Sequence, residues 1–339
     1  MALRAAGVLW VSALVGAQVS PAPELAVVET RRIEEVASVG QPSKPGTTRQ
    51  VPLGLDLYMP VPEDNPLTVE KIALGRRLFR DRRLSCDQSL SCASCHDPRR
   101  AFSSAKPRAI GVFGRTGRRN APALINRGYG RAFFWDGRTT TLEAQVLRPI
   151  EDVNEMDLTL AEASARVGLD IETIADALAS YVRSILSGDS PLDRYLNGDR
   201  TALSPRQQEG LRLFRGKANC TSCHVGPTLS DEQFHNTGVA WKDGELVDQG
   251  RALVTGGEAD RGAFKTPTLR EVARTAPYMH DGSFPRLEDV VRFYSEGGRQ
   301  NPNLDPEIRP LGLTRGERRA LVAFLQALSG TIQDGLQRP

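Results

Sequence analysis

The sequence predicts a mainly α-helical fold made of two tandem domains with long loops. An internal repeat indicates the two domains, because residues 75–80 read Gly-Arg-Arg-Leu-Phe-Arg and residues 210–215 read Gly-Leu-Arg-Leu-Phe-Arg. Two amphipathic segments, 177–188 and 320–330, form a second matching pair, and each has an aromatic residue in its middle and ends in Ser-Gly. Strand patterns are limited to short Val-bearing runs near residues 236–247.

Local signals indicate where the helices begin and end. Residues 314–317 have capping-box spacing, and both Ser-Gly pairs are expected to form helix C-caps. Pro205 is expected to begin the first helix of the second half, which puts the boundary near residues 199–204. We therefore predict one domain over residues 66–200 and another over residues 201–332.

The composition is that of an ordinary globular protein. The 339 residues are 40% hydrophobic and 25% charged, which is enough material for two packed domains. The net charge is +3, and the basic residues are scattered among acidic ones, so nucleic-acid binding is not expected.

The N-terminus has the pattern of a cleaved secretory signal over residues 1–20. Arg4 precedes an apolar run over residues 5–17 that is too short to span a bilayer. An uncleaved anchor is the alternative. We expect a periplasmic protein with a polar linker or N-terminal arm over residues 21–65 and no stable membrane span after signal cleavage.

Four of the five cysteines lie in two C-x-x-C-H motifs, at residues 92–96 and 220–224. In this spacing two thiols add to the vinyl groups of a haem, and the adjacent histidine reaches the iron from the same face. The predicted attachment residues are Cys92, Cys95, Cys220 and Cys223, and the predicted iron ligands are His96 and His224. The sequence therefore predicts two covalent haem c groups.

Two other kinds of cysteine site explain the motifs less well. A zinc site would need both cysteine pairs close together and would leave each histidine unexplained. A thioredoxin-like pair needs a preceding strand, whereas residues 78–79 and 213–214 lie in helical patterns. Cys86 is expected to be a structural or free thiol. Each half is thus expected to be a cytochrome c-like domain wrapped around one haem.

The sixth position of each iron decides between electron transfer and peroxide binding. Between His96 and His224 the chain has no other histidine, and Met156 is the only methionine there. Because methionine more often fills gaps in cores, we expect an open first haem that can bind peroxide. Such a haem needs polar groups to move a proton and orient the substrate, and the segment from Phe133 to Glu155 contains candidates.

Several motifs together resemble the bacterial di-haem cytochrome c peroxidase and MauG family, over roughly residues 52–330. They are the two haem motifs, Asn-Ala-Pro at 120–122, Phe-Trp-Asp-Gly-Arg at 134–138, Phe-Lys-Thr-Pro-Thr-Leu-Arg at 264–270 and Ala-Pro-Tyr-Met-His-Asp-Gly at 276–282. The resemblance implies a peroxidatic first haem and an electron-transfer second haem.

The resemblance also implies the roles of individual residues. Gln145 and Glu155 match the distal glutamine and the acid/base glutamate, Pro149 matches a distal proline, and Trp135 matches the tryptophan between the haems. The family's calcium ion would use the side chain of Asn120 and the carbonyls of Lys265 and Pro267, and oxygen ligands suit that ion.

The chain departs from the peroxidase pattern at two places and from MauG at a third. It lacks the histidine that many relatives carry after the first haem motif, so no reductive activation is expected. Tyr294 stands where peroxidases carry the methionine ligand of the second haem and where MauG has tyrosine, with Met279 and His280 as alternative ligands. Ala218 stands where MauG has the surface tryptophan that passes oxidising equivalents to its protein substrate.

These observations predict an enzyme that reduces hydrogen peroxide to water. Electrons would come from a small redox donor protein of the cytochrome c or cupredoxin type, enter at the second haem and pass to the open first haem. One alternative is MauG-like oxidation of a protein substrate through high-valent states of both haems. The other is an electron-transfer cytochrome without catalytic activity.

Overall fold

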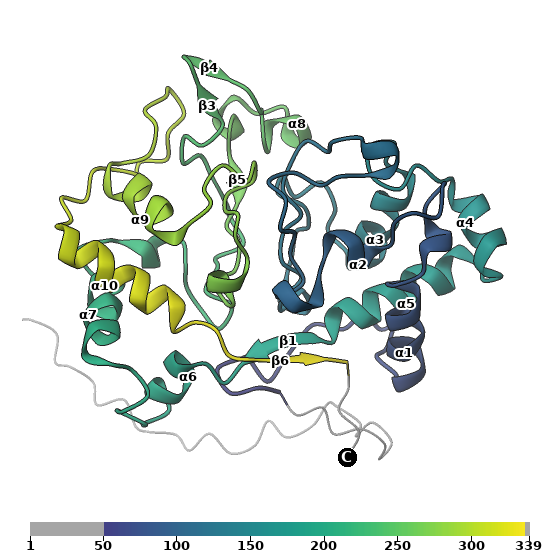
Figure 1. Ribbon diagram of the computed structural model, residues 1–339, viewed down its shortest axis with the longest axis horizontal. Helices are drawn as coiled ribbons and strands as arrows, with labels where there is room; N and C mark the ends of the chain where they lie inside the picture. Colours follow the sequence, from purple (N-terminus) through teal and green to yellow (C-terminus); the bar gives the residue numbers. More distant parts are fainter. Residues whose placement is uncertain (1–50, 336–339) are drawn as a thin grey trace, which may run out of the picture. The chain divides into compact units, whose positions relative to one another are not determined.

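The computed structural model describes residues 51–335, all of which belong to one compact unit (Figure 1). The predicted signal over 1–20 and most of the predicted arm over 21–65 lie outside the described residues. Among residues 51–335 no helix is both long and apolar enough to cross a membrane. The prediction of a mainly helical chain with short strands and long loops is confirmed, whereas the predicted domain limits stay predictions.

The α-helices are α1 (Val69–Leu78), α2 (Cys92–Cys95), α3 (Leu142–Glu151), α4 (Leu160–Val167), α5 (Ile171–Arg183), α6 (Pro191–Leu196), α7 (Pro205–Arg215), α8 (Ala252–Thr255), α9 (Leu287–Ser295) and α10 (Arg315–Gln326). The strands are β1 (Ile185–Gly188), β2 (Phe234–His235), β3 (Trp241–Lys242), β4 (Glu245–Leu246), β5 (Phe264–Lys265) and β6 (Thr331–Asp334). They pair antiparallel as β1 with β6, β2 with β5, and β3 with β4. As predicted, α7 begins at Pro205, and the Thr314 to Glu317 capping box begins α10.

The sequence repeat corresponds to two closely packed helix pairs, α1 with α5 and α7 with α10 (Figure 1). A Cβ atom on Gly75 would lie 1.9 Å from the Ala177 carbonyl oxygen, and a Cβ atom on Gly210 would lie 2.1 Å from that of Ala320. Only glycine allows two helix backbones to approach so closely.

An aromatic contact accompanies each close approach. The rings of Phe79 and Tyr181 lie 5.1 Å apart between α1 and α5, and those of Phe214 and Phe324 lie 5.0 Å apart between α7 and α10. All four side chains are buried, and each pair belongs to its own hydrophobic cluster. The repeated aromatic residues therefore fill the interfaces that the two glycines allow to form.

The expectation that the Ser-Gly pairs cap the helices is wrong. Helix α5 ends at Arg183, and Ser187 and Gly188 lie within strand β1. Helix α10 ends at Gln326, before Ser329 and Gly330. The helices end early because the chain then extends into the β1–β6 sheet, whose long-range pairing local signals do not reveal.

A buried carboxylate joins the two Ser-Gly segments at this sheet. Glu271 is fully buried, and its Oε1 atom accepts hydrogen bonds from the Ser187 hydroxyl at 2.6 Å and from the Gly330 N–H at 2.7 Å. The Asn126 side chain pairs with the backbone of Ser187 on the same strand. These contacts fix the chain after both closing helices.

Replacing Gly210 by alanine should destabilise the protein by about 1–3 kcal/mol, because the added carbon would overlap the Ala320 carbonyl. Gly316 is the matched control, since it also lies in a helix but a Cβ there would make only an ordinary contact with the Thr314 hydroxyl at 3.8 Å. Gly316→Ala should be neutral or stabilise by up to about 1 kcal/mol. Denaturant unfolding of the haem-loaded protein measures both, and equal midpoints would contradict the close approach.

Candidate functional site

The first C-x-x-C-H motif forms a short, firmly held helix. Ser91 and Ser94 make reciprocal capping contacts at the start of α2, and the N–H of His96 donates to the Cys92 carbonyl at 2.9 Å. Because α2 is a single turn, Cys92 and Cys95 lie on the same side of it, and the His96 ring lies next to them. The segment therefore presents two thiols and an imidazole together.

The ring of His96 is oriented by the backbone. Its Nδ1 atom lies 3.1 Å from the Phe102 carbonyl oxygen, a contact that requires the proton on Nδ1 and leaves the lone pair on Nε2. Burial lowers the pKa of His96, although the carbonyl contacts oppose this shift, so the ring stays neutral near neutral pH. This is the form of histidine that ligates a metal.

The second motif has the same arrangement. The N–H of His224 donates to the Cys220 carbonyl at 2.9 Å, and Nδ1 lies 2.9 Å from the Leu229 carbonyl oxygen. Burial lowers the pKa of this histidine as well. Two separate segments thus present equivalent donor sets, each of two sulfur atoms and one neutral imidazole.

The first motif opens on a cavity of about 680 Å³. Cys95 and His96 line it together with four of the predicted catalytic residues, which are Trp135, Gln145, Pro149 and Glu155. Gln145 and Pro149 lie four residues apart on α3 and therefore share one face of that helix. The adjacent stripe of α3, formed by Leu142, Val146 and Ile150, is buried in the core.

The structure thus brings the predicted acid/base glutamate to the same cavity as His96. Burial and the nearby carboxylate of Asp152 raise the pKa of Glu155 to about 7, and the Arg138 guanidinium opposes this shift. A carboxyl group with this pKa is present in both protonation states near neutral pH. It can therefore accept a proton and return it within one reaction.

The second motif opens on a smaller cavity of about 220 Å³. Its walls include Cys220, Cys223 and His224 and all three candidates for the second iron ligand, Tyr294, Met279 and His280. Burial raises the pKa of Tyr294 to about 12, together with the nearby thiols, whereas the Thr237 hydroxyl opposes the shift. The His280 ring is buried and stacked on Phe264 with centroids 3.6 Å apart.

Trp135 lines both cavities and is held by backbone groups from both sides. Its indole Nε1–H donates to the Asn120 carbonyl at 2.8 Å, and its own carbonyl accepts from the Lys265 N–H at 2.8 Å. Asn120 is fixed in turn by its N–H, which donates to the His280 carbonyl at 2.7 Å. An aromatic ring is therefore positioned between the two motif sites.

The three predicted calcium ligands Asn120, Lys265 and Pro267 also line the first cavity. The Asn120 Nδ2 atom donates to the Lys106 carbonyl at 2.9 Å, so its Oδ1 is the side-chain atom available for a cation. The Lys265 ammonium is buried and donates to Glu232 at 3.3 Å and to the Thr266 carbonyl at 3.1 Å. Burial and Arg127 lower the pKa of Lys265 to about 7, although Glu232 opposes the shift.

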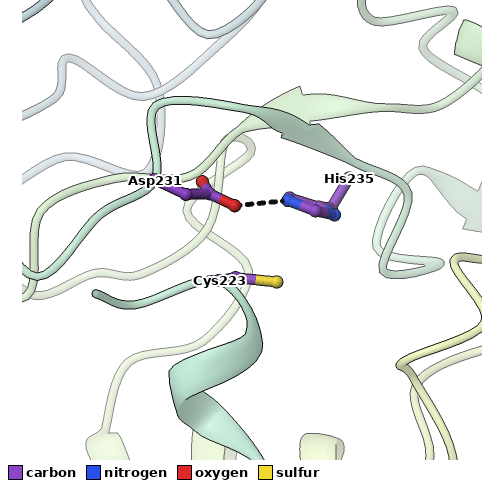
Figure 2. Close-up of side chains that lie close together, drawn as sticks. All are labelled: Cys223, Asp231 and His235. Carbon is purple, nitrogen blue, oxygen red and sulfur yellow. Dashed lines mark hydrogen bonds and ion pairs between the residues drawn. The ribbon is translucent and has the colours of Figure 1, made fainter. Parts of the chain in front are cut away.

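One cluster at the second motif was not anticipated from the sequence. Figure 2 shows Cys223, Asp231 and His235, whose ligand atoms lie within 4.8 Å of one another. The His235 Nε2 lies 3.0 Å from Asp231, and its Nδ1 lies 2.6 Å from Asp305. Because a neutral imidazole has only one N–H, two carboxylate partners favour the imidazolium form.

The pKa of His235 agrees with this geometry. The Cys223 thiol, Asp305 and Asp231 raise it to about 10 against the effect of burial. Since Cys223 belongs to the second C-x-x-C-H motif, the cluster is part of that site rather than a separate metal centre. Of the two aspartates that contact His235, Asp231 lies close to it in the sequence. Asp305 lies too far along the chain for sequence spacing to reveal the cluster.

Comparison with known proteins identifies the chain. Residues 69–201 match the family of di-haem cytochrome c peroxidases. The methylamine utilization protein MauG of Methylorubrum extorquens is 39% identical over 288 residues, which cover 80% of this chain and 81% of that protein. The chain belongs to the di-haem cytochrome c peroxidase family.

Other members of this family carry two kinds of name. The cytochrome-c peroxidase IdrP2 of Denitromonas iodatirespirans is 35% identical over 344 residues, covering 88% of this chain and 92% of that protein. A crystal structure of a MauG-like protein associated with microbial copper homeostasis has a TM-score of 0.74 at 35% identity and covers 81% of this chain and 95% of that one. The chain is therefore an oxidoreductase of a family with both peroxidase and MauG members.

The residues of the chain fit two haems. Cys220, Cys223 and His224 line the second cavity, whereas Cys95 and His96 line the first cavity and share a small neighbouring cavity of about 60 Å³ with Cys92. Two cysteine sulfurs and a neutral imidazole are the donor set of haem c. The residues that would hold the groups are those of the two motifs. Met156 is buried in the hydrophobic cluster of the first half and also lines the small cavity beside Cys92, and Cys86 packs against the same cluster.

Proposed function

We propose that the chain is a periplasmic peroxidase that reduces hydrogen peroxide to water at a haem attached to Cys92 and Cys95. The observation that carries this proposal is the convergence of Gln145, Pro149 and Glu155 on the cavity of His96. His96 is the only histidine among the described residues that line this cavity, which supports an open first haem.

Haem iron, when bound at His96, supplies the centre where peroxide binds and where two electrons break its O–O bond. The overall change is one peroxide, two electrons and two protons to two waters. The Glu155 carboxylate would accept the proton from one peroxide oxygen and deliver it to the departing oxygen. The Gln145 amide would hold the substrate by hydrogen bonding, and Pro149 would keep that wall apolar.

Electrons are proposed to enter at the second haem, attached to Cys220 and Cys223, and to pass by Trp135. Its position in the walls of both cavities supports this route. The donor is proposed to be a small cytochrome c or cupredoxin. Calcium bound by Asn120, Lys265 and Pro267 is a further proposal, supported by the family resemblance and by their shared cavity.

Oxidation of a protein substrate is the second candidate function. The 39% identity to a MauG protein and the presence of Tyr294 in the second cavity favour it. Ala218 argues against the MauG route, because it is buried in the wall of the second cavity and has no aromatic side chain. The third candidate, an electron-transfer cytochrome, does not explain the distal carboxyl group.

Haem content tests the attachment sites. Replacing both Cys92 and Cys95, or both Cys220 and Cys223, by serine should leave one covalent haem per chain. Each double variant removes the two sulfur atoms of one motif and leaves the other motif intact. Cys86→Ser is the matched control and should keep two. Mass spectrometry and the pyridine haem spectrum measure the number, and a double variant that retained two haems would refute the assignment.

Peroxide kinetics test the function. Peroxide mixed with the diferric protein should change its spectrum, and Glu155→Gln should slow turnover by about 10²-fold or more. Because Glu155 accepts a proton only when ionised, wild-type activity should fall as the pH drops below about 7, and this limb should be absent in the variant. Glu151→Gln, an exposed change at the end of α3, should behave like wild type.

The outcomes separate the three candidates. A spectrum that peroxide leaves unchanged would leave only the electron-transfer cytochrome. Turnover of Glu155→Gln equal to that of wild type would remove this residue from the acid/base role. Peroxide consumption that required a protein substrate would favour the MauG-like reaction.

Replacement of Tyr294 by phenylalanine tests the second iron ligand. An anionic tyrosinate stabilises ferric iron, so its loss should raise the reduction potential of the second haem and alter its near-infrared magnetic spectrum. Tyr278→Phe is the control, because Tyr278 lines the same cavity. If only Met279→Leu or a His280 variant changed these spectra, Tyr294 would not be the ligand.

A further inference from the structure

The second cavity reaches the surface at a small rim. Among the residues that line this cavity, Ser222, Glu307 and Arg309 are exposed. The Asn219 Nδ2 atom donates to Glu307 at 2.6 Å, which ties the C-x-x-C-H loop to the loop that carries Arg309. The rim is therefore built from two segments that are held together.

Two exposed arginines precede the second motif in the chain. Arg212 and Arg215 lie in the last turn of α7, just before Cys220, while Leu211 and Phe214 of the same helix are buried. Arg212 and Arg215 therefore project away from the core. We call Arg212, Arg215 and Arg309 the basic rim.

The charges of the basic rim are not neutralised within the described residues. None of its three arginines forms an ion pair there, whereas the adjacent Lys217 is paired with Glu317 at 2.9 Å. Glu307 is the one exposed carboxylate among the residues that line the cavity. An excess of positive charge thus surrounds the place where the second cavity meets solvent.

The first half gives a direct contrast, because the repeat puts arginines at the equivalent positions. Arg80 corresponds to Arg215, and it lies 3.7 Å from Asp334, which also binds Arg76 at 3.0 Å. The carboxylate of the last strand therefore reduces the charge beside the first motif. Beside the second motif no such carboxylate accompanies Arg215 among residues 51–335.

A small exposed apolar patch directly follows the second motif. Val225 follows His224 directly and is 42% exposed, and Gly226 and Pro227 beside it are exposed too. Surfaces for brief electron-transfer encounters combine a small apolar contact with surrounding charge, because charge guides the encounter and the contact brings the redox centres close.

We propose that the basic rim is the docking surface for a small redox protein whose own redox centre is surrounded by acidic residues. The inference rests on the proposed entry of electrons at the second haem. Complementary charge would increase the rate of encounter and would disfavour donors with a basic face. The rim thus selects the donor by the sign of its charge.

Oxidation of the dithionite-reduced second haem by an external protein, measured by stopped flow without peroxide, tests the proposal independently of peroxidase activity, because electron exchange in either direction uses the same docking surface. The probes are an oxidised acidic plastocyanin and an oxidised basic mitochondrial cytochrome c. The acidic probe should react faster, and its rate constant should fall as salt screens the charges. Arg212→Glu combined with Arg215→Glu should lower this rate constant about tenfold or more.

The matched control is Arg77→Glu combined with Arg82→Glu, which makes the same charge change beside the first motif on exposed arginines without ion pairs in the described residues. The control should stay within about twofold of wild type, since its charges lie away from the rim. Equal losses in both double variants would overturn the proposal. So would a wild-type rate with the acidic probe that rises with salt, a result that needs no variant to fold.

A protein that shows this salt and charge dependence but no peroxide turnover would keep the docking surface and lose the proposed peroxidase function. Peroxide turnover together with unchanged electron-transfer rates in the rim variants would keep the peroxidase function and remove the docking surface. The two proposals can therefore fail separately.

Discussion

Two glycines control the architecture, because at each of them a carbonyl oxygen of the partner helix occupies the place of a Cβ atom. Gly75 allows α1 to approach α5, and Gly210 allows α7 to approach α10. The first helix of each pair leads toward a cysteine motif, and the second leads into a strand of the shared sheet. The position of each histidine thus depends on a contact between backbones that any side chain would prevent.

The two cavities differ in the groups that they offer. The first has a glutamine, a proline and a carboxyl group with a pKa near neutrality, all carried by or near α3. The second is smaller, and its polar groups include a half-buried tyrosine and a histidine stacked on phenylalanine. The same arrangement of the two motifs therefore lies in two chemically different environments.

Much of this could be predicted from the sequence because the signals were local. The start of α7 follows from Ser204 and Pro205, and the prediction of haem attachment rests on the spacing of Cys92, Cys95 and His96. The shared cavity of Gln145 and Glu155 came from the family resemblance, since exposed polar residues on a helix are usually only solvated.

The errors and omissions concern long-range contacts. The Ser-Gly pairs were mistaken for caps because the pairing of β1 with β6 and the Glu271 carboxylate that joins them come from distant segments. The His235 cluster was missed for the same reason, as Asp305 reaches it from another loop. Spacing along the chain does not contain this information.

The β1–β6 pairing also bears on how such a chain can arise from a duplicated unit. Strand β1 is buried along its whole length and follows the closing helix of the first half, yet its partner comes from the very end of the second. A single half would expose a buried strand edge, which is a template for pairing with another chain. Each half therefore covers the strand edge that the other would leave open.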